Sequence, residues 1–314
     1  MEYSVVVQSI SIISLMIIIG AILSKSFKFS EDTRKVFISL ILNVGMPCII
    51  LSSIFKVDMN QNTFKMIMIV FCLSIVINVT GIGIGWLFAR LFFPKSNKRR
   101  ELALLAGLGN TSFIGIPLCA VLLGPKGALY AAIFDAGVDV TIWTIGVLML
   151  QKDKSYKINT FKAMLNVPII AAVLGLTMSY FQYKPPGLVI DLVDQLAAIA
   201  APLAMFYIGI LVMSLQLTKI KNDVSQVWLP ILIKLVVLPL IVSFFLTFLI
   251  LDLTIVQTLL IQSMMPTLTL ASILFAKYAA DENMGATTTV FSILLSLITI
   301  PLLIYLMNHF LVAI

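Results

Sequence analysis

The segment Leu105–Leu118 reads Leu-Ala-Gly-Leu-Gly-Asn-Thr-Ser-Phe-Ile-Gly-Ile-Pro-Leu. It lies inside a long apolar segment, yet it contains three glycines, a proline and the polar run Asn110-Thr111-Ser112. A helix that breaks at membrane depth must face protein or a water-filled cavity, because hydrocarbon cannot satisfy the freed backbone groups. Many transporters hold their substrate at such interrupted spans. The alternative is a kinked structural helix, since Gly and Pro are common in membrane spans.

The composition of the chain is that of a membrane protein. Of its 314 residues, 61% are hydrophobic and 11% charged, with a mean hydropathy of +1.10. Soluble domains average about 45–50% apolar and 25% charged residues. A membrane-spanning helix needs about 20 mostly apolar residues. We therefore predict an all-α membrane protein with ten transmembrane segments, which are 5–23, 36–55, 66–92, 101–123, 127–150, 163–181, 188–215, 228–250, 255–278 and 286–309.

The basic residues, which give a net charge of +7, are distributed unevenly among the loops. The odd-numbered loops carry sixteen Lys and Arg, and the even-numbered loops carry four. The positive-inside rule places the odd loops in the cytoplasm and both termini outside. This distribution indicates a multi-pass protein of the cell membrane in contact with the lipid bilayer, and it does not indicate a nucleic-acid partner.

The two halves of the chain resemble each other. Residues 1–150 hold five predicted spans, 151–162 form a hydrophilic cytoplasmic linker, and 163–314 hold five more. Because five is odd, the second half must lie upside-down relative to the first, which is an inverted repeat. The repeat predicts that the ninth span is also broken, and Gln262–Thr269 places Pro266 and several hydroxyl groups inside it.

Two broken spans predict a binding site near the middle of the membrane. Each break yields a half-helix whose N-terminus carries a positive partial charge, which favours an anion such as a carboxylate. Pro117, or the residues just before it, would open one half-helix, and Pro266 suits a first helical position. The substrate-binding candidates with amide or hydroxyl side chains are Asn110, Thr111, Ser112, Ser263, Thr267 and Thr269. A fixed carboxylate or lysine would also neutralise the dipoles, so the sign of the substrate stays open.

Three charged residues lie deep in predicted spans. Asp135 and Asp139 are four residues apart, on one face of the fifth span, and Lys234 lies in the eighth. Intramembrane carboxylates are costly and mark ion or proton pathways by default. The aspartates either couple transport to H⁺ or Na⁺ or form a buried pair with Lys234. Lys234 is either their counter-ion or a substrate ligand.

Other chemistry has no support in the sequence. The three cysteines lie in apolar spans without a CxxC pattern or a nearby histidine, so we expect neither disulfides nor a metal site. Motifs of metalloproteases and serine hydrolases are absent from the sequence. We expect no cofactor and no enzyme activity.

Several motifs resemble those of the auxin efflux carrier family. The most specific is Gly-Asn-Thr-Ser-Phe-Ile-Gly-Ile-Pro-Leu at 109–118, followed by Met265-Pro-Thr267 with Ala276-Lys-Tyr278. Weaker matches are Asn166-Val-Pro168 with Gly175, Ala201-Pro-Leu-Ala204 with Gly209, Leu238-Pro-Leu240, and Ser292 through Pro301. The resemblance covers nearly the whole chain.

The resemblance implies an architecture and a cargo. It implies that broken helices four and nine cross, as in sodium/proton antiporters and bile-acid symporters. It implies a scaffold domain of spans 1, 2, 6 and 7, and a transport domain of spans 3–5 and 8–10 that moves like an elevator. It also implies an organic-anion cargo, with the carboxylate-binding asparagine at Asn110 and a second site residue at Asn166. The sixth-span motif departs from that of plant carriers, because the proline is shifted to Pro168 and no second asparagine follows it. A bacterial-type malate or malonate permease therefore fits better.

Three functions remain open from the sequence. The first is a secondary transporter of a small organic carboxylate, arranged as a homodimer through the scaffold domain. The second is a sodium- or proton-driven cation exchanger that uses the fifth-span aspartates. The third is a membrane protein that binds or senses a ligand without transporting it.

Overall fold

The computed structural model describes residues 3–26, 30–151, 166–214 and 224–310, and nearly all of them lie in helices. Within these ranges no β-strand forms, which confirms the all-α class. Six described helices are long and apolar enough to cross a membrane, namely Asp32–Lys56, Gln61–Phe92, Thr111–Leu150, Gly187–Met213, Ser225–Leu246 and Glu282–Leu306. Shorter apolar helices are Ser11–Leu23, Val167–Tyr180 and Leu253–Ser263. Most of the predicted linker 151–162 lies outside the described residues.

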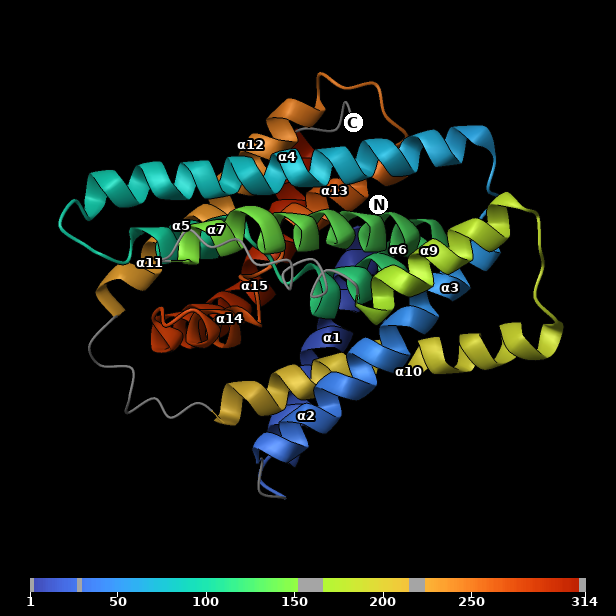
Figure 1. Ribbon diagram of the computed structural model, residues 1–314, viewed down its shortest axis with the longest axis horizontal. Helices are drawn as coiled ribbons and strands as arrows, with labels where there is room; N and C mark the ends of the chain where they lie inside the picture. Colours follow the sequence, from blue (N-terminus) through green and yellow to red (C-terminus); the bar gives the residue numbers. More distant parts are fainter. Residues whose placement is uncertain (1–2, 27–29, 152–165, 215–223, 311–314) are drawn as a thin grey trace. The chain divides into compact units, whose positions relative to one another are not determined.

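The chain divides into two compact units, each built from several stretches of sequence. The first unit consists of Met1–Val70, Ser112–Ile133 and Leu165–Leu215. Its helices include α1 (Tyr3–Leu23), α2 (Glu31–Leu40), α3 (Met46–Lys56), α9 (Val167–Tyr180) and α10 (Gly187–Ser214). Helix α10 packs against α1 and α3, and α3 also packs against α9 (Figure 1).

Glycines set the distance between α1 and α10. A Cβ atom on Gly20 would lie 2.3 Å from the carbonyl oxygen of Phe206, and one on Gly209 would lie 2.0 Å from that of Ile17. Small residues let two backbones approach closely, and this contact supplies the packing that apolar side chains in lipid cannot. The first unit also holds a polar contact, in which Asp194 accepts a hydrogen bond from Ser52 at 2.6 Å.

The second unit consists of Phe71–Thr111, Phe134–Met164 and Gln216–Ile314. It contains most of α4 (Gln61–Phe92), together with α5 (Arg99–Gly107), α7 (Val147–Leu150), α11 (Val224–Leu232), α12 (Leu238–Leu246), α13 (Leu253–Ser263), α14 (Ala271–Lys277) and α15 (Glu282–Phe310). Helices α4 and α5 approach through small residues. A Cβ atom on Gly81 would lie 2.9 Å from the Cα of Gly107, and one on Gly85 would lie 2.6 Å from the Cβ of Ala106.

Prolines explain three π-helical segments. These segments are η1 (Ile41–Gly45), η2 (Thr111–Gly115) and η5 (Ile233–Val237), and each ends two residues before a proline. A proline cannot donate to the carbonyl four residues earlier, and its ring clashes with that carbonyl. A wider π-turn accommodates the misfit, and such turns often occur at functional sites. The segment η3 (Ile142–Gly146) lacks this proline and has no such explanation.

Helix α6 (Ile116–Thr141) contains a bend between the predicted fourth and fifth spans. Gly124 has φ 68° and ψ −161°, which an L-residue rarely adopts, and Pro125 follows it.

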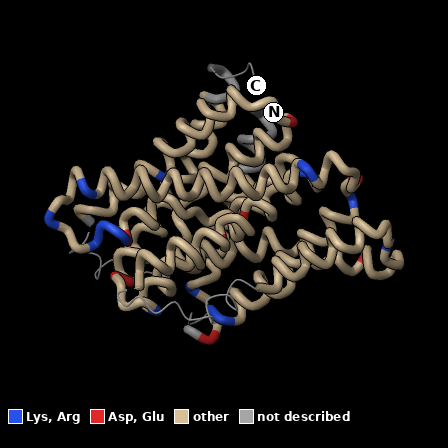
Figure 2. Tube along the Cα trace, turned by 45° about the horizontal axis from the view of Figure 1, so that its top comes forward, with Lys and Arg blue, Asp and Glu red and all other residues tan. Residues whose placement is uncertain are grey.

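The helices show the charge distribution of membrane spans. Lys and Arg gather mostly at helix ends and connections, while long helical stretches carry neither sign (Figure 2).

Candidate functional site

Two helices of the second unit are interrupted at the positions that the sequence predicts. Helix α5 ends at Gly107, and Leu108 is extended, with φ −94° and ψ 127°. Helical structure resumes at Thr111. Helix α13 ends at Ser263, and α14 begins only at Ala271.

The two interrupted segments pair through their backbones. Gly109 and Thr267 form an antiparallel bridge. Next to it, the N–H of Asn110 donates to the carbonyl of Pro266 at 2.7 Å, and the N–H of Leu268 donates to the carbonyl of Leu108 at 3.2 Å. Each interrupted segment thus forms hydrogen bonds with backbone groups of the other. These bonds avoid the free-energy cost of leaving polar backbone groups unpaired away from water.

Buried polar side chains surround this backbone pairing. Asn110, which is 2% exposed, donates from Nδ2 to Oγ1 of Thr269. The hydroxyl groups of Thr267 and Ser292 are hydrogen-bonded at 2.7 Å, and the N–H of Thr267 donates to the same Ser292 oxygen at 3.1 Å. Thr289 donates to the carbonyl of Leu268 at 2.9 Å. Helix α15 therefore holds the second interrupted segment in place through two hydroxyl groups.

A buried cation lies beside the first interrupted segment. Lys234 belongs to η5 and is only 1% exposed. A Cβ atom on Gly109 would lie 2.9 Å from its Cε and 3.0 Å from its Nζ. Among the residues that the structure describes, no carboxylate lies within 4.0 Å of this ammonium group, so Lys234 forms no ion pair with Asp135 or Asp139.

The buried carboxylate of Asp135 contacts the residue that follows Asn110. Thr111 donates from Oγ1 to Oδ1 of Asp135 at 2.5 Å, and Asp135 is 8% exposed. One turn later on α6, Asp139 is half-buried. The hydroxyl of Ser74 on α4 donates to the carbonyl of Phe134 and so fastens this part of α6. Asp135 thus contacts Thr111, the residue that follows Asn110 in the first interrupted segment.

Comparison with known proteins identifies the family of the chain. The family model of the membrane transport proteins matches residues 5–304. The chain belongs to this family. The resemblance to the auxin efflux carrier family is thereby confirmed, and the chain is a membrane transporter.

Named relatives of this transporter share about a quarter of its residues. An uncharacterized transporter of Methanothermobacter thermautotrophicus is 23% identical over 94% of this chain and 96% of its own length. An uncharacterized transporter of Methanocaldococcus jannaschii is 23% identical over 65% of this chain and 68% of its own length. A protein of Rhizobium meliloti named "putative malonate transporter" is 24% identical over 74% of this chain and 75% of its own length.

Not every predicted site residue of the transporter lies at the paired segments. Ser263 donates to the carbonyl of Leu260 in its own helix at 2.7 Å. Ser112 and Pro117 belong to the first unit, as does Asn166. The Asn166 side chain accepts from the N–H of Ile169 at 2.9 Å and caps the start of α9.

Of the two predictions for prolines at half-helix starts, one agrees with the structure and the other does not. The first half-helix opens at Thr111, which agrees with a start just before Pro117. Pro266 does not occupy a first helical position, so that prediction is wrong. Its carbonyl accepts from Asn110, and a turn follows before α14 begins at Ala271.

Sequence reasoning missed two residues of the site, Ser292 and Thr289. The sequence did hold a signal for them, because the run Thr287-Thr288-Thr289 and Ser292 place four hydroxyl groups in an apolar helix. Within the described part of the chain, no group of three or more His, Cys, Asp or Glu side chains is placed to hold a metal ion.

Proposed function

We propose that this membrane transporter is a secondary carrier of small organic carboxylates. The observation that carries the proposal is the buried ammonium group of Lys234 beside Gly109, without a carboxylate partner among the described residues. Moving an unpaired ion out of water is unfavourable by several kcal/mol. A substrate carboxylate at the paired segments would supply the missing counter-charge. The proposal favours Lys234 as a substrate ligand over Lys234 as a counter-ion of the aspartates.

Asn110 is the proposed hydrogen-bonding partner of the same carboxylate. It lies next to Gly109 in the extended segment, and the backbone pairing with Pro266 and the bond to Thr269 hold it in place. A group held in advance loses little conformational entropy on binding. We propose that Thr111, Thr267 and Thr269 shape the same site. The Rhizobium meliloti relative supports a dicarboxylate such as malonate as a first substrate to test.

We further propose that the second unit moves as the transport domain. It contains both paired segments, Lys234 and Asp135, while the first unit contains α1, α2, α3, α9 and α10, together with Ser112–Ile133 of the predicted fourth and fifth spans. This division supports an elevator-like movement in which the first unit is the scaffold. In a variant without native cysteines, a cysteine at Leu268, which is half-buried in the second interrupted segment, should react with a membrane-impermeant reagent from either side, and substrate should slow that reaction. Reaction from one side alone under all conditions would contradict alternating access.

We propose ten membrane spans in a five-plus-five inverted repeat, with crossing fourth and ninth spans, both termini outside and a cell-membrane location. The interrupted helices support this count, because α5 has nine residues and α13 and α14 have eleven and seven, too few to span alone. Single cysteines introduced at Lys98 and Lys126 should react with impermeant reagents from opposite faces. A homodimer through the first unit completes the proposal, and light scattering on the purified protein tests it.

The experiment that tests the proposed function is uptake into liposomes. Purified protein should accumulate labelled malonate or malate, and Asn110→Ala should reduce the uptake at least about tenfold, since a hydrogen bond to a charged group contributes about 1.5–3 kcal/mol. Asn62→Ala, at an exposed position of α4, is the matched control and should leave uptake unchanged. Equal uptake by both variants would refute the assignment of Asn110.

One observation favours a second candidate, a sodium- or proton-driven cation exchanger. Asp135 is a buried carboxylate in a predicted span, and such groups mark ion pathways. A sodium gradient or a pH jump imposed without any organic substrate separates the candidates. An exchanger would respond with a counter-flux of ions, whereas a carboxylate carrier would not.

A further inference from the structure

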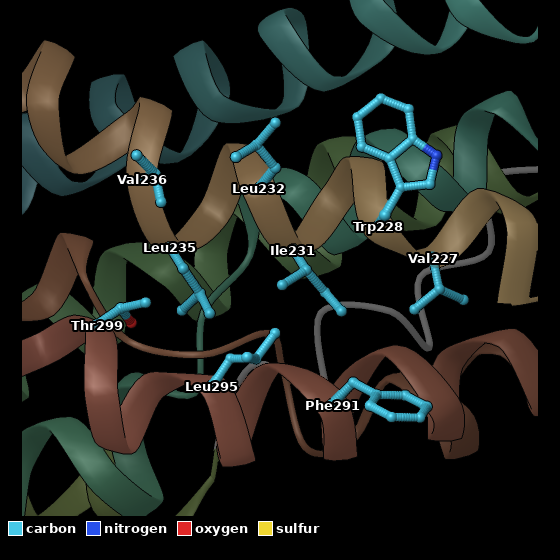
Figure 3. A pocket seen from close by; sticks show the side chains of 9 residues that line it. All are labelled: Val227, Trp228, Ile231, Leu232, Leu235, Val236, Phe291, Leu295 and Thr299. Atoms are coloured by element: carbon cyan, nitrogen blue, oxygen red, sulfur yellow. The ribbon is translucent and has the colours of Figure 1, made fainter.

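A largely apolar groove runs along the surface of the second unit between α11–η5 and α15. Val227, Ile231 and Leu235 extend toward α15, and Phe291 and Leu295 line the opposite side (Figure 3). Both sets follow a spacing of four residues, which places each on one helix face. The groove has a volume of about 440 Å³, within the range of about 300–1,000 Å³ that is typical of ligand sites. Its rim is open, since Leu295 is 44% exposed.

A basic pocket of about 760 Å³ lies in the same unit, at the end of α4 and the start of α5. Its charged lining residues are Arg90, Lys98, Arg99, Arg100, Glu101 and Asp281. Cations therefore outnumber carboxylates by four to two. Trp86 and Tyr278 also line the pocket, and Trp and Tyr are the residues enriched at membrane–water interfaces.

Two of these cations are already engaged and two are better placed to bind a ligand. Lys98 forms an ion pair with Asp281 at 2.5 Å, and Arg100 donates to the carbonyl of Met149 at 3.3 Å. Arg90 lies over the ring of Trp86, 5.6 Å from its centroid, and is exposed. Arg99 lies in the first turn of α5.

Direct contacts connect the groove with the basic pocket. Ser96 donates to Oε1 of Gln226 at 3.0 Å, and Gln226 immediately precedes the first groove residue. The indole ring of Trp228, at the groove rim, lies edge-on to Phe92 at 5.6 Å and to Phe93 at 6.3 Å. These contacts place the start of α11, at one end of the groove, beside the loop between α4 and α5 that lines the basic pocket.

We propose that the pocket and the groove together bind one anionic phospholipid. The headgroup phosphate pairs with Arg90 and Arg99, and one acyl chain lies in the groove along Ile231, Leu235 and Leu295. The basic end belongs to the loops that the positive-inside rule assigns to the cytoplasm, where anionic lipids attract basic clusters. A soluble phosphate would use the pocket but not the groove, and a neutral lipid would use the groove but not the pocket. An anionic phospholipid uses both.

The test is thermal unfolding of the purified transporter in a neutral detergent with added lipid. Phosphatidylglycerol should raise the midpoint of unfolding at concentrations at which phosphatidylcholine and free glycerol phosphate do not. The double variant Arg90→Gln/Arg99→Gln should require over tenfold more phosphatidylglycerol for the same shift, since each neutralised basic residue weakens the attraction about fivefold. Leu295→Trp, which fills the groove, should weaken the shift while all four cations remain.

The matched control is Lys65→Gln/Lys184→Gln, which removes two exposed cations from elsewhere in the chain and should leave the response to phosphatidylglycerol unchanged. An unfolding midpoint without lipid shows whether each variant is folded. An equal response to phosphatidylcholine, or a response that all variants share, would overturn the proposal. If glycerol phosphate alone reproduces the shift, the pocket is a soluble phosphate site and the lipid proposal is wrong.

Discussion

The ammonium group of Lys234 lies directly beside Gly109. A Cβ atom at Gly109 would come within 3.0 Å of Nζ, closer than non-bonded side chains tolerate. Because Gly109 has no side chain, the ammonium group of Lys234 can lie next to the backbone of the extended segment. The same segment carries Asn110, so the charge of Lys234 lies beside the residue that precedes the amide of the candidate site.

Gly109→Ala should impair transport more than folding. The added methyl group meets the far end of a flexible lysine, which can turn away and take its charge from the site. We expect malonate uptake in liposomes to fall about tenfold or more, with an unfolding midpoint close to that of the parent. Gly83→Ala is the control, because a Cβ atom there meets nothing within 4 Å. A similar loss of uptake in both variants would show that the effect is not specific to Gly109.

Lys234→Met should separate stability from substrate affinity. Methionine removes a buried charge at similar volume, so the thermal stability should stay equal or rise. The KM for malonate should rise about tenfold to a hundredfold, because a charge-assisted hydrogen bond contributes about 1.5–3 kcal/mol. Lys65→Met, at an exposed site on α4, should change neither quantity. An unchanged KM would remove Lys234 from the substrate site.

Asp135→Asn should uncouple transport without abolishing binding. The amide keeps an oxygen that accepts from Thr111, but it can no longer gain or lose a proton or bind a cation as a charge. Uptake driven by a proton or sodium gradient should disappear, whereas exchange of internal for external substrate should persist. Asp58→Asn, at an exposed position, should behave like the parent. Intact gradient-driven uptake would assign coupling to another residue.

Gly209→Ala should weaken the first unit. The methyl group would lie 2.0 Å from the carbonyl oxygen of Ile17, and backbone atoms cannot yield as a side-chain end can. Overpacking of this kind is unfavourable by about 1–3 kcal/mol or more, so the midpoint of thermal unfolding in detergent should fall. Gly187→Ala meets open space and should leave the midpoint equal or slightly higher. Equal midpoints would mean that α1 and α10 can separate without loss.

Local features of the sequence determined the class of this protein and the places where its helices break. Hydropathy over windows of about 20 residues depends only on neighbouring residues, so the apolar helices were predictable. The glycines before Asn110 and the proline at 266 likewise act on their own stretch of chain. The signature around Asn110 was specific enough to indicate the family.

Only the tertiary structure decided which side chains meet at the breaks. Lys234 reaches Gly109 across 125 positions of sequence, and Asn110 reaches Thr269 across 159. The π-turn before Pro239 and the backbone pairing of Asn110 with Pro266 set these contacts. Hydropathy and local helix propensity depend on neighbouring residues and therefore do not predict such long-range pairing. That is why the sequence located the broken helices but left open whether Lys234 faced the aspartates or the site, and why it assigned Pro266 to a helix start.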